Sequence, residues 1–120
     1  MLVRTFDECP EFIAGDKTIL HELLHPDKAD VALDYSLAHA TLEPGTISSL
    51  HALKTSEVYY ILSGYGRMEI DGETRDVKAG DTIYIPPDGR QRIAALGSEK
   101  LAFLCIVCPA WRVEDEIVLE

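Results

Sequence analysis

One histidine and one glutamate, six positions apart, are the residues of this chain best placed to do chemistry. His51 and Glu57 lie between the turn pair Pro44-Gly45 and the glycines Gly64 and Gly66. Because their positions differ by an even number, an extended conformation points both side chains toward the same face. An imidazole and a carboxylate that share a cavity suit a divalent metal ion or a proton-transfer pair. A polar hairpin face exposed to solvent is the remaining interpretation.

Length and charge limit the class of protein. The 120 residues fit a single domain that buries about two thirds of its unfolded surface, and 47% of them are hydrophobic. The net charge of −10 opposes binding to nucleic acid and to anionic membranes. The longest apolar run, residues 101–107, is too short to cross a bilayer, and no apolar leader follows Met1. We therefore expect a cytoplasmic protein, with the acidic residues at positions 114–116 and 120 forming a solvated tail.

Two short motifs match patterns typical of metal sites, but the sequence around each of them argues against that role. His21-Glu22-Leu-Leu-His25 matches the H-E-x-x-H pattern of zinc proteases, which requires a helix. Pro26 directly after His25 disfavours a helix, so we expect a strand or a short helical turn. Cys105 and Cys108 form a C-x-x-C pair inside a strand-like run. Positions three apart in a strand face opposite sides, so this pair is not expected to bind one metal ion.

The remaining chain consists of short strand patterns separated by turns. Residues 31–42 are predicted as a long strand, with Leu33, Tyr35, Leu37 and His39 on its more apolar face. His39 is interpreted there as a core residue rather than a ligand. Asp-Gly at 71–72 between alternating runs predicts a hairpin, and further strands are expected over 82–85, 90–95 and 101–107. Seven or more short strands without a convincing helix predict an antiparallel sandwich or barrel.

These residues also resemble the cupin family. The first cupin motif, G-x5-H-x-H-x3-E-x6-G, falls with every spacing intact on Gly45, His51, Leu53, Glu57 and Gly64. The second motif, G-x5-P-x-G-x2-H-x3-N, falls on Gly80, Pro86, Asp88, Gln91 and Ala95. The chain is similar to small single-domain cupins of the conserved-barrel type, some of them loosely labelled mannose-6-phosphate isomerase-like. The resemblance implies an all-β double-stranded β-helix, or jelly-roll barrel, in one domain over residues 1–120. Within it we expect an arm and edge strands over 1–30, the barrel over 31–108 and an extension over 109–120.

The departures from the family pattern concern the metal ligands. Metal-binding cupins generally use two histidines and a glutamate of the first motif and a histidine of the second. Here Leu53 replaces one histidine and Gln91 replaces another. His51, Glu57 and the weaker amide donor of Gln91 are the predicted ligands for Zn²⁺, Ni²⁺, Fe²⁺ or Mn²⁺. The alternative is a cavity that takes an organic ligand without metal.

The resemblance implies binding of a small polar metabolite such as a sugar, sugar phosphate or organic acid. A metal-assisted isomerase or related enzyme is the first hypothesis, with Tyr59 as a catalytic residue because it shares the strand parity of Glu57. A metal-free binding module and a metal-independent isomerase or epimerase that uses His51 and Tyr59 are the alternatives. Arg90 and Arg92 flank Gln91 and are expected to point outward. The weakly patterned residues 1–17 suit the exchanged arm of a homodimer.

Overall fold

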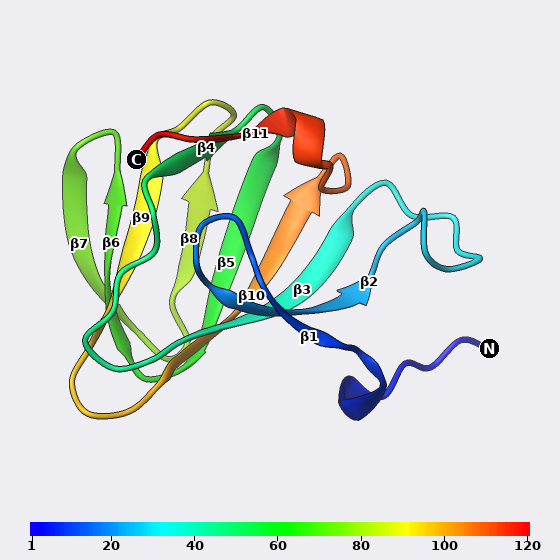
Figure 1. The fold of residues 1–120 in the computed structure, drawn as a ribbon, viewed down its shortest axis with the longest axis horizontal. Helices are drawn as coiled ribbons and strands as arrows, with labels where there is room; N and C mark the ends of the chain where they lie inside the picture. Colours follow the sequence, from blue (N-terminus) through cyan, green and yellow to red (C-terminus); the bar gives the residue numbers. More distant parts are fainter.

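The computed structural model describes residues 1–120 as two antiparallel sheets packed face to face (Figure 1). Two short 3-10 helices, η1 (Phe6–Glu8) and η2 (Val113–Asp115), accompany them. The six-stranded sheet has the spatial order β1 (Glu11–Ile13), β2 (Ile19–Leu24), β3 (Ser36–Leu42), β10 (Leu101–Cys108), β5 (Ser56–Ser63) and β8 (Thr82–Ile85). The five-stranded sheet has the order β11 (Glu116–Val118), β4 (His51–Leu53), β9 (Gln91–Leu96), β6 (Tyr65–Ile70) and β7 (Glu73–Lys78). The predicted all-β jelly-roll barrel is confirmed. No helix is both long and apolar enough to cross a membrane.

The core lies between the two sheets and follows the two-residue period of the strands. In β10, Leu101, Phe103, Cys105 and Val107 are buried, and the residues between them are only partly so. Twelve buried residues from both sheets form one contiguous cluster. Alternation of this kind buries one face of each strand and leaves the other for solvent or for further packing.

Two turns show why particular residues are needed. Asp71 and Gly72 both adopt positive φ, 49° and 84°, which suits the tight hairpin that the Asp-Gly pair predicts between β6 and β7. Gly64 joins β5 to β6 at φ +85°, and a Cβ atom there would lie 2.5 Å from the carbonyl oxygen of Lys100. Only glycine fits such a position.

The predicted strand over residues 31–42 is wrong in its first part, because β3 begins at Ser36. The neighbouring strands supply no partner beyond that point: Leu24 of β2 pairs with Leu37, and Val107 of β10 pairs with Ser36. Without a ladder, residues 31–35 form a loop. The predicted core face is also wrong. Ala40 belongs to the central cluster, whereas His39 lies on the opposite face of β3.

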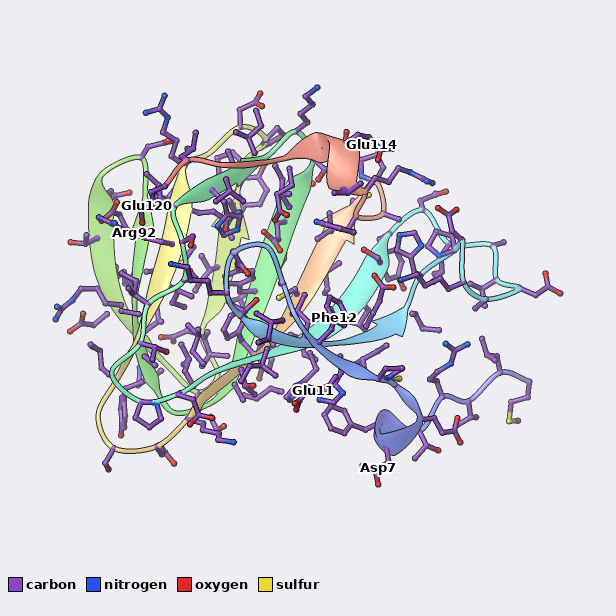
Figure 2. All side chains as sticks on the ribbon, viewed as in Figure 1. Asp7, Glu11, Phe12, Arg92, Glu114 and Glu120 are labelled. Carbon is purple, nitrogen blue, oxygen red and sulfur yellow. The ribbon has the colours of Figure 1, made fainter.

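The acidic C-terminal segment was expected to be a solvated tail. Glu114 and Glu120 are exposed as expected, but the segment is ordered and is not a free tail. Residues 116–118 form β11, which pairs with β4, and the Leu119 amide donates to the carbonyl oxygen of Leu50 at 2.8 Å. Glu120 accepts hydrogen bonds from the Leu50 amide (3.0 Å) and from the Arg92 guanidinium (3.3 Å). Figure 2 shows the labelled Glu120 and Arg92 close together beside this end of the smaller sheet. Partner groups on β4 and β9 therefore order the segment despite its charge.

The H-E-x-x-H segment is extended, as the following proline indicates. His21 lies in β2, where its Nδ1 is 2.8 Å from the carbonyl oxygen of Cys9. His25 is buried, with Nε2 2.7 Å from the Trp111 carbonyl oxygen and Nδ1 accepting from the Asp27 amide at 3.0 Å. Both imidazoles are thus used in backbone contacts, and the protease arrangement is not formed.

Candidate functional site

A cavity of about 160 Å³ opens among the loop before β2, strands β4, β5 and β10, and β11. Most of its wall is apolar, and Phe12, Leu53 and Phe103 are among the lining residues. Figure 2 labels Phe12 on the short strand β1, which contributes to this wall. The lining side chains with acid–base or nucleophilic chemistry are Asp16, Glu22, His51, Glu57, Tyr59, Cys105 and Glu116.

His51 enters the cavity from β4 with one ring nitrogen already held. The residue is 2% exposed, and its Nδ1 lies 2.8 Å from the carbonyl oxygen of Ser49. A carbonyl oxygen only accepts hydrogen bonds, so Nδ1 carries the proton and donates. Nε2 is consequently the nitrogen left for chemistry, and it lies 3.5 Å from Oδ2 of Asp16.

Asp16 reaches His51 from the loop between β1 and β2. Its Oδ1 accepts from the amide (3.1 Å) and the hydroxyl (2.7 Å) of Thr18, an Asx-type turn that orients the carboxylate. The Asp16 carbonyl oxygen also accepts from the Ser49 amide at 2.8 Å, which fastens the loop to the segment before β4. Sequence reasoning missed Asp16. The Asp-x-Thr pattern signals the turn, but it gives no sign of which strand the turn will meet.

Glu57, Gln91 and Tyr59 form a buried hydrogen-bonded chain. The Gln91 Nε2 group donates to Oε1 of Glu57 at 2.9 Å, and the Tyr59 hydroxyl donates to Oε1 of Gln91 at 2.9 Å. Burial raises the pKa of Glu57 to about 8, against the opposing effect of the Gln91 hydrogen bond and with a smaller contribution from Asp16. Burial, followed by the charge of Glu57, raises the pKa of Tyr59 well above its ordinary value. At neutral pH this arrangement favours a protonated Glu57.

The structure brings three of the four predicted site residues to the cavity wall. His51, Glu57 and Tyr59 line it, whereas Gln91 is fully buried behind them and touches Glu57 and Tyr59. His51 and Gln91 are direct partners in the β4–β9 ladder, which explains why the two motifs meet. Leu53 also lines the cavity and is buried.

The donor set does not fit a divalent metal ion as it is arranged. Both polar atoms of the Gln91 amide are engaged in hydrogen bonds, and Leu53 has no donor atom. That leaves one imidazole nitrogen and a Glu57 carboxylate, whereas catalytic zinc sites take three protein ligands. No group of three or more His, Cys, Asp or Glu side chains is placed to hold an ion. Metal binding by His51, Glu57 and Gln91 stays a prediction.

Two further cavity residues were not predicted as part of the site. Glu116 in β11 pairs with Leu53 of β4, and burial, opposed by His51 and reinforced by Asp16, raises its pKa. A Cβ atom at Gly15 would lie 3.1 Å from Oε2 of Glu116, so the loop passes directly against this carboxylate. Burial also raises the pKa of the Cys105 thiol well above its ordinary value, which disfavours a reactive thiolate. Cys108 is exposed and points away, as the strand periodicity predicts.

Other polar side chains of the barrel lie outside the cavity. His39 packs against Phe6, with ring centroids 5.0 Å apart, and Tyr84 is 62% exposed. Arg90 is exposed, and Arg92 forms ion pairs with Glu69 (3.2 Å) and Glu120 (3.3 Å) on the surface. The predicted outward direction of the two arginines is confirmed.

Comparisons with known proteins agree with this architecture. The cupin domain model matches residues 38–107. An uncharacterized protein of Methanocaldococcus jannaschii is 41% identical over 116 residues, which cover 96% of this chain and 92% of the relative. An oxalate-binding protein of Thermotoga maritima is 30% identical, with 89% of this chain and 93% of the relative covered. The structure of Pac13, a nucleoside dehydratase of Streptomyces, matches with a TM-score of 0.80 at 21% identity and covers 100% of this chain and 92% of that one. The matched domain spans more than half of the chain and contains both motifs, and the chain therefore belongs to the cupin family.

Proposed function

We propose that the cavity binds a small polar organic molecule and that His51 and Glu57 transfer protons to and from it. The cavity volume of about 160 Å³ supports a ligand near the size of benzene, which occupies an engineered cavity of about 150 Å³. One related protein is described as binding oxalate, and a fold neighbour has been solved with uridine. Both support a small-molecule ligand within the barrel.

The observation that carries the proposal is how the two functional side chains are held. His51 uses Nδ1 on the Ser49 carbonyl oxygen, and Glu57 uses Oε1 on the Gln91 amide. Each therefore keeps one polar atom, Nε2 or Oε2, for a molecule in the cavity that both line. One group accepts a proton from the ligand while the other returns a proton to a neighbouring atom. Isomerisation, epimerisation and elimination all use this pair of steps.

For Tyr59 we propose a positioning role in preference to the catalytic role that the sequence predicted. Its hydroxyl donates to Gln91, and through Gln91 it fixes the carboxyl group of Glu57. Direct proton transfer by Tyr59 remains the alternative, because its ring lines the cavity.

A metal-dependent enzyme is the second candidate. The observation in its favour is the 3.5 Å approach of His51 Nε2 and Asp16 Oδ2, which brings an imidazole and a carboxylate together in the cavity. A bound Zn²⁺, Ni²⁺, Fe²⁺ or Mn²⁺ would supply Lewis-acid chemistry. The Gln91 amide is engaged elsewhere, and Asp16, His51 and Glu57 are not grouped closely enough to hold an ion, so this candidate ranks second.

Ligand screening with and without a chelator separates the candidates. Untagged protein is analysed for metal content, and thermal stabilisation is measured with sugars, sugar phosphates, organic acids and nucleosides. The proposal predicts stabilisation that survives EDTA, disappears in His51→Ala and persists in the control Tyr84→Phe, whose side chain is exposed outside the cavity. Stoichiometric metal together with chelator-sensitive binding would favour the metal-dependent enzyme instead.

We also propose a homodimer. Tyr60 and Leu62 of β5 are both 41% exposed, and Tyr84 of β8, which is paired with Val58, faces the same side. Large exposed side chains on adjacent strands support an association surface on the outer face of the larger sheet. Light scattering at micromolar concentration tests this, and a monomeric mass for the wild-type chain would contradict it.

Net charge and cysteine content support a proposal for the cellular compartment and for the partners of this protein. Three free cysteines support a reducing, cytoplasmic compartment. The net charge of −10 supports the expectation that neither nucleic acid nor an anionic membrane is a partner.

A further inference from the structure

The titratable groups around the cavity are acidic, with one imidazole among them. Asp16, Glu57 and Glu116 line it together with His51, and no lysine or arginine does. Glu22 is a further lining acid, but Lys28 pairs with it at 2.6 Å, so its charge is already matched. Glu57 is protonated at neutral pH, so the unmatched carboxylates are those of Asp16 and Glu116, both near His51.

The single imidazole does not balance these carboxylates. His51 Nε2 lies 3.5 Å from Asp16, which makes these two residues a pair. Glu116 then has a hydrogen bond from the Trp111 side chain but no salt-bridge partner among lysines and arginines. The cavity therefore has an excess of negative charge next to an apolar wall.

The carboxylates are fixed and directed inward rather than spread over a surface. Asp16 and Glu57 are each 6% exposed, and both line the cavity. Hydrogen bonds hold Oδ1 of Asp16 and Oε1 of Glu57, and these leave Oε2 of Glu57 without a protein partner. Glu116 lies close to the loop backbone, because a Cβ atom at Gly15 would lie 3.1 Å from its Oε2. Because Glu57 is protonated at neutral pH, the negative charge at the cavity comes from Asp16 and Glu116. That charge raises the cost of admitting another anion and lowers the cost of admitting a cation.

We propose that the ligand is a small organic cation, an amine or amidine on an apolar body, and that Asp16 and Glu116 select it. This inference rests on the proposed function, because it names the class of molecule that enters the same cavity. The cationic nitrogen donates to the carboxylates of the β1–β2 loop and of β11. Phe12, Leu53 and Phe103 contact the apolar body. An anionic sugar phosphate or organic acid would meet carboxylates without any lysine or arginine to receive it.

Three probes with one ring and different charge test the assignment. Benzylamine, benzyl alcohol and benzoate match the size of the cavity and differ at a single group. Titration calorimetry with the full chain at neutral pH should give benzylamine an affinity at least about tenfold above that of benzyl alcohol, with benzoate weakest. Glu116→Gln and Asp16→Asn should each weaken benzylamine several-fold and leave benzyl alcohol nearly unchanged. Glu114→Gln is the matched control, because Glu114 lies in the same segment, is exposed and does not line the cavity (Figure 2).

The possible results separate the cation assignment from the proposed small-molecule function. Benzyl alcohol or benzoate binding as tightly as benzylamine, with sensitivity to His51→Ala, would overturn the cation assignment and leave small-molecule binding standing. Weakening by Glu114→Gln equal to that by Glu116→Gln would also overturn it, because general surface charge would then explain the preference. Binding of none of the three probes would overturn the assignment and count against the proposed function as well. Circular dichroism of each variant checks the fold, and Asp16→Asn replaces Glu116→Gln if β11 detaches.

Discussion

Gln91 donates a hydrogen bond to Glu57 across the barrel, from Nε2 to Oε1 at 2.9 Å. The two residues belong to different sheets, β9 and β5, so this bond links the two halves of the cupin motif. Gln91 can also accept, and it does so from Tyr59. A single amide thereby orients Glu57 and satisfies the buried phenol. The position that carries histidine in metal-binding cupins therefore has a structural use in this chain.

The raised pKa of Glu57 predicts a stability that falls as pH rises. Between its ordinary value of 4.5 and about 8, the folded state keeps a proton that the unfolded state has released. This contribution to the free energy of unfolding is complete below about pH 4.5 and decreases by about 1.4 kcal/mol per pH unit up to about pH 8. Glu57→Gln preserves the acceptor for Gln91 and removes the titration. The difference in unfolding free energy between the two proteins, measured by urea denaturation in EDTA, should change with this slope.

Comparing Glu57→Gln with the wild type cancels the contributions that the other titrating groups, including Glu116, make to the pH dependence of stability. A difference that stays constant from pH 5 to pH 8 would show that Glu57 has an ordinary pKa in the folded protein. Glu57 would then be ionised, not protonated, at neutral pH.

Tyr59→Phe should destabilise the fold more than an exposed tyrosine substitution does. Loss of the hydroxyl leaves Oε1 of Gln91 buried without its partner, which costs about 1–3 kcal/mol. Tyr84→Phe is the control and should change stability by less than about 0.5 kcal/mol. Once a substrate is known, a positioning role predicts that Gln91→Leu reproduces the kinetic change of Tyr59→Phe. A loss of turnover in Tyr59→Phe alone would instead support direct catalysis by the phenol.

The two glycines of the first cupin motif should respond differently to alanine. Both have positive φ, but a Cβ at Gly45 meets nothing within 4 Å, whereas at Gly64 it lies 2.5 Å from the Lys100 carbonyl oxygen. Gly45→Ala should lower the free energy of unfolding by about 1–2 kcal/mol, because alanine must adopt the left-handed conformation. Gly64→Ala should lower it clearly more. Thermal or urea unfolding measures both. Equal losses would show that the backbone at Lys100 moves away without cost.

Restoring the family's histidines should create a metal site. Leu53→His combined with Gln91→His adds two imidazoles beside His51 and Glu57, in the ligand set that the cupin motif provides. Elemental analysis after dialysis should show more bound divalent metal in this variant than in the wild type. Adding His51→Ala to the variant should reverse the gain. Equal, stoichiometric metal in the wild type would mean that Leu53 and Gln91 do not limit binding.

Local patterns in the chain were enough to predict an antiparallel sandwich or barrel, whereas the jelly-roll barrel and the position of Gln91 followed from the resemblance to cupins. Apolar alternation identifies the strands, and Asp71-Gly72 specifies its hairpin because both residues tolerate positive φ. The spacing of His51 and Glu57 predicted that both face one cavity, because side chains alternate along strands. Both line it, although His51 lies on β4 and Glu57 on β5 of the other sheet. The opposite orientations of Cys105 and Cys108 follow from the same rule.

Contacts between distant segments decided the rest. Residues 31–35 have a strand-like sequence but no partner strand, and the acidic C-terminal segment is ordered because β4 offers it a free edge. Asp16 and Glu116 reach the cavity only because the β1–β2 loop and β11 pack over it. The sequence alone determined which residues alternate and where the chain turns, since both depend on neighbouring backbone geometry. Which strand each segment meets, and which carboxylates surround His51, depends on long-range pairing that only the tertiary structure decides.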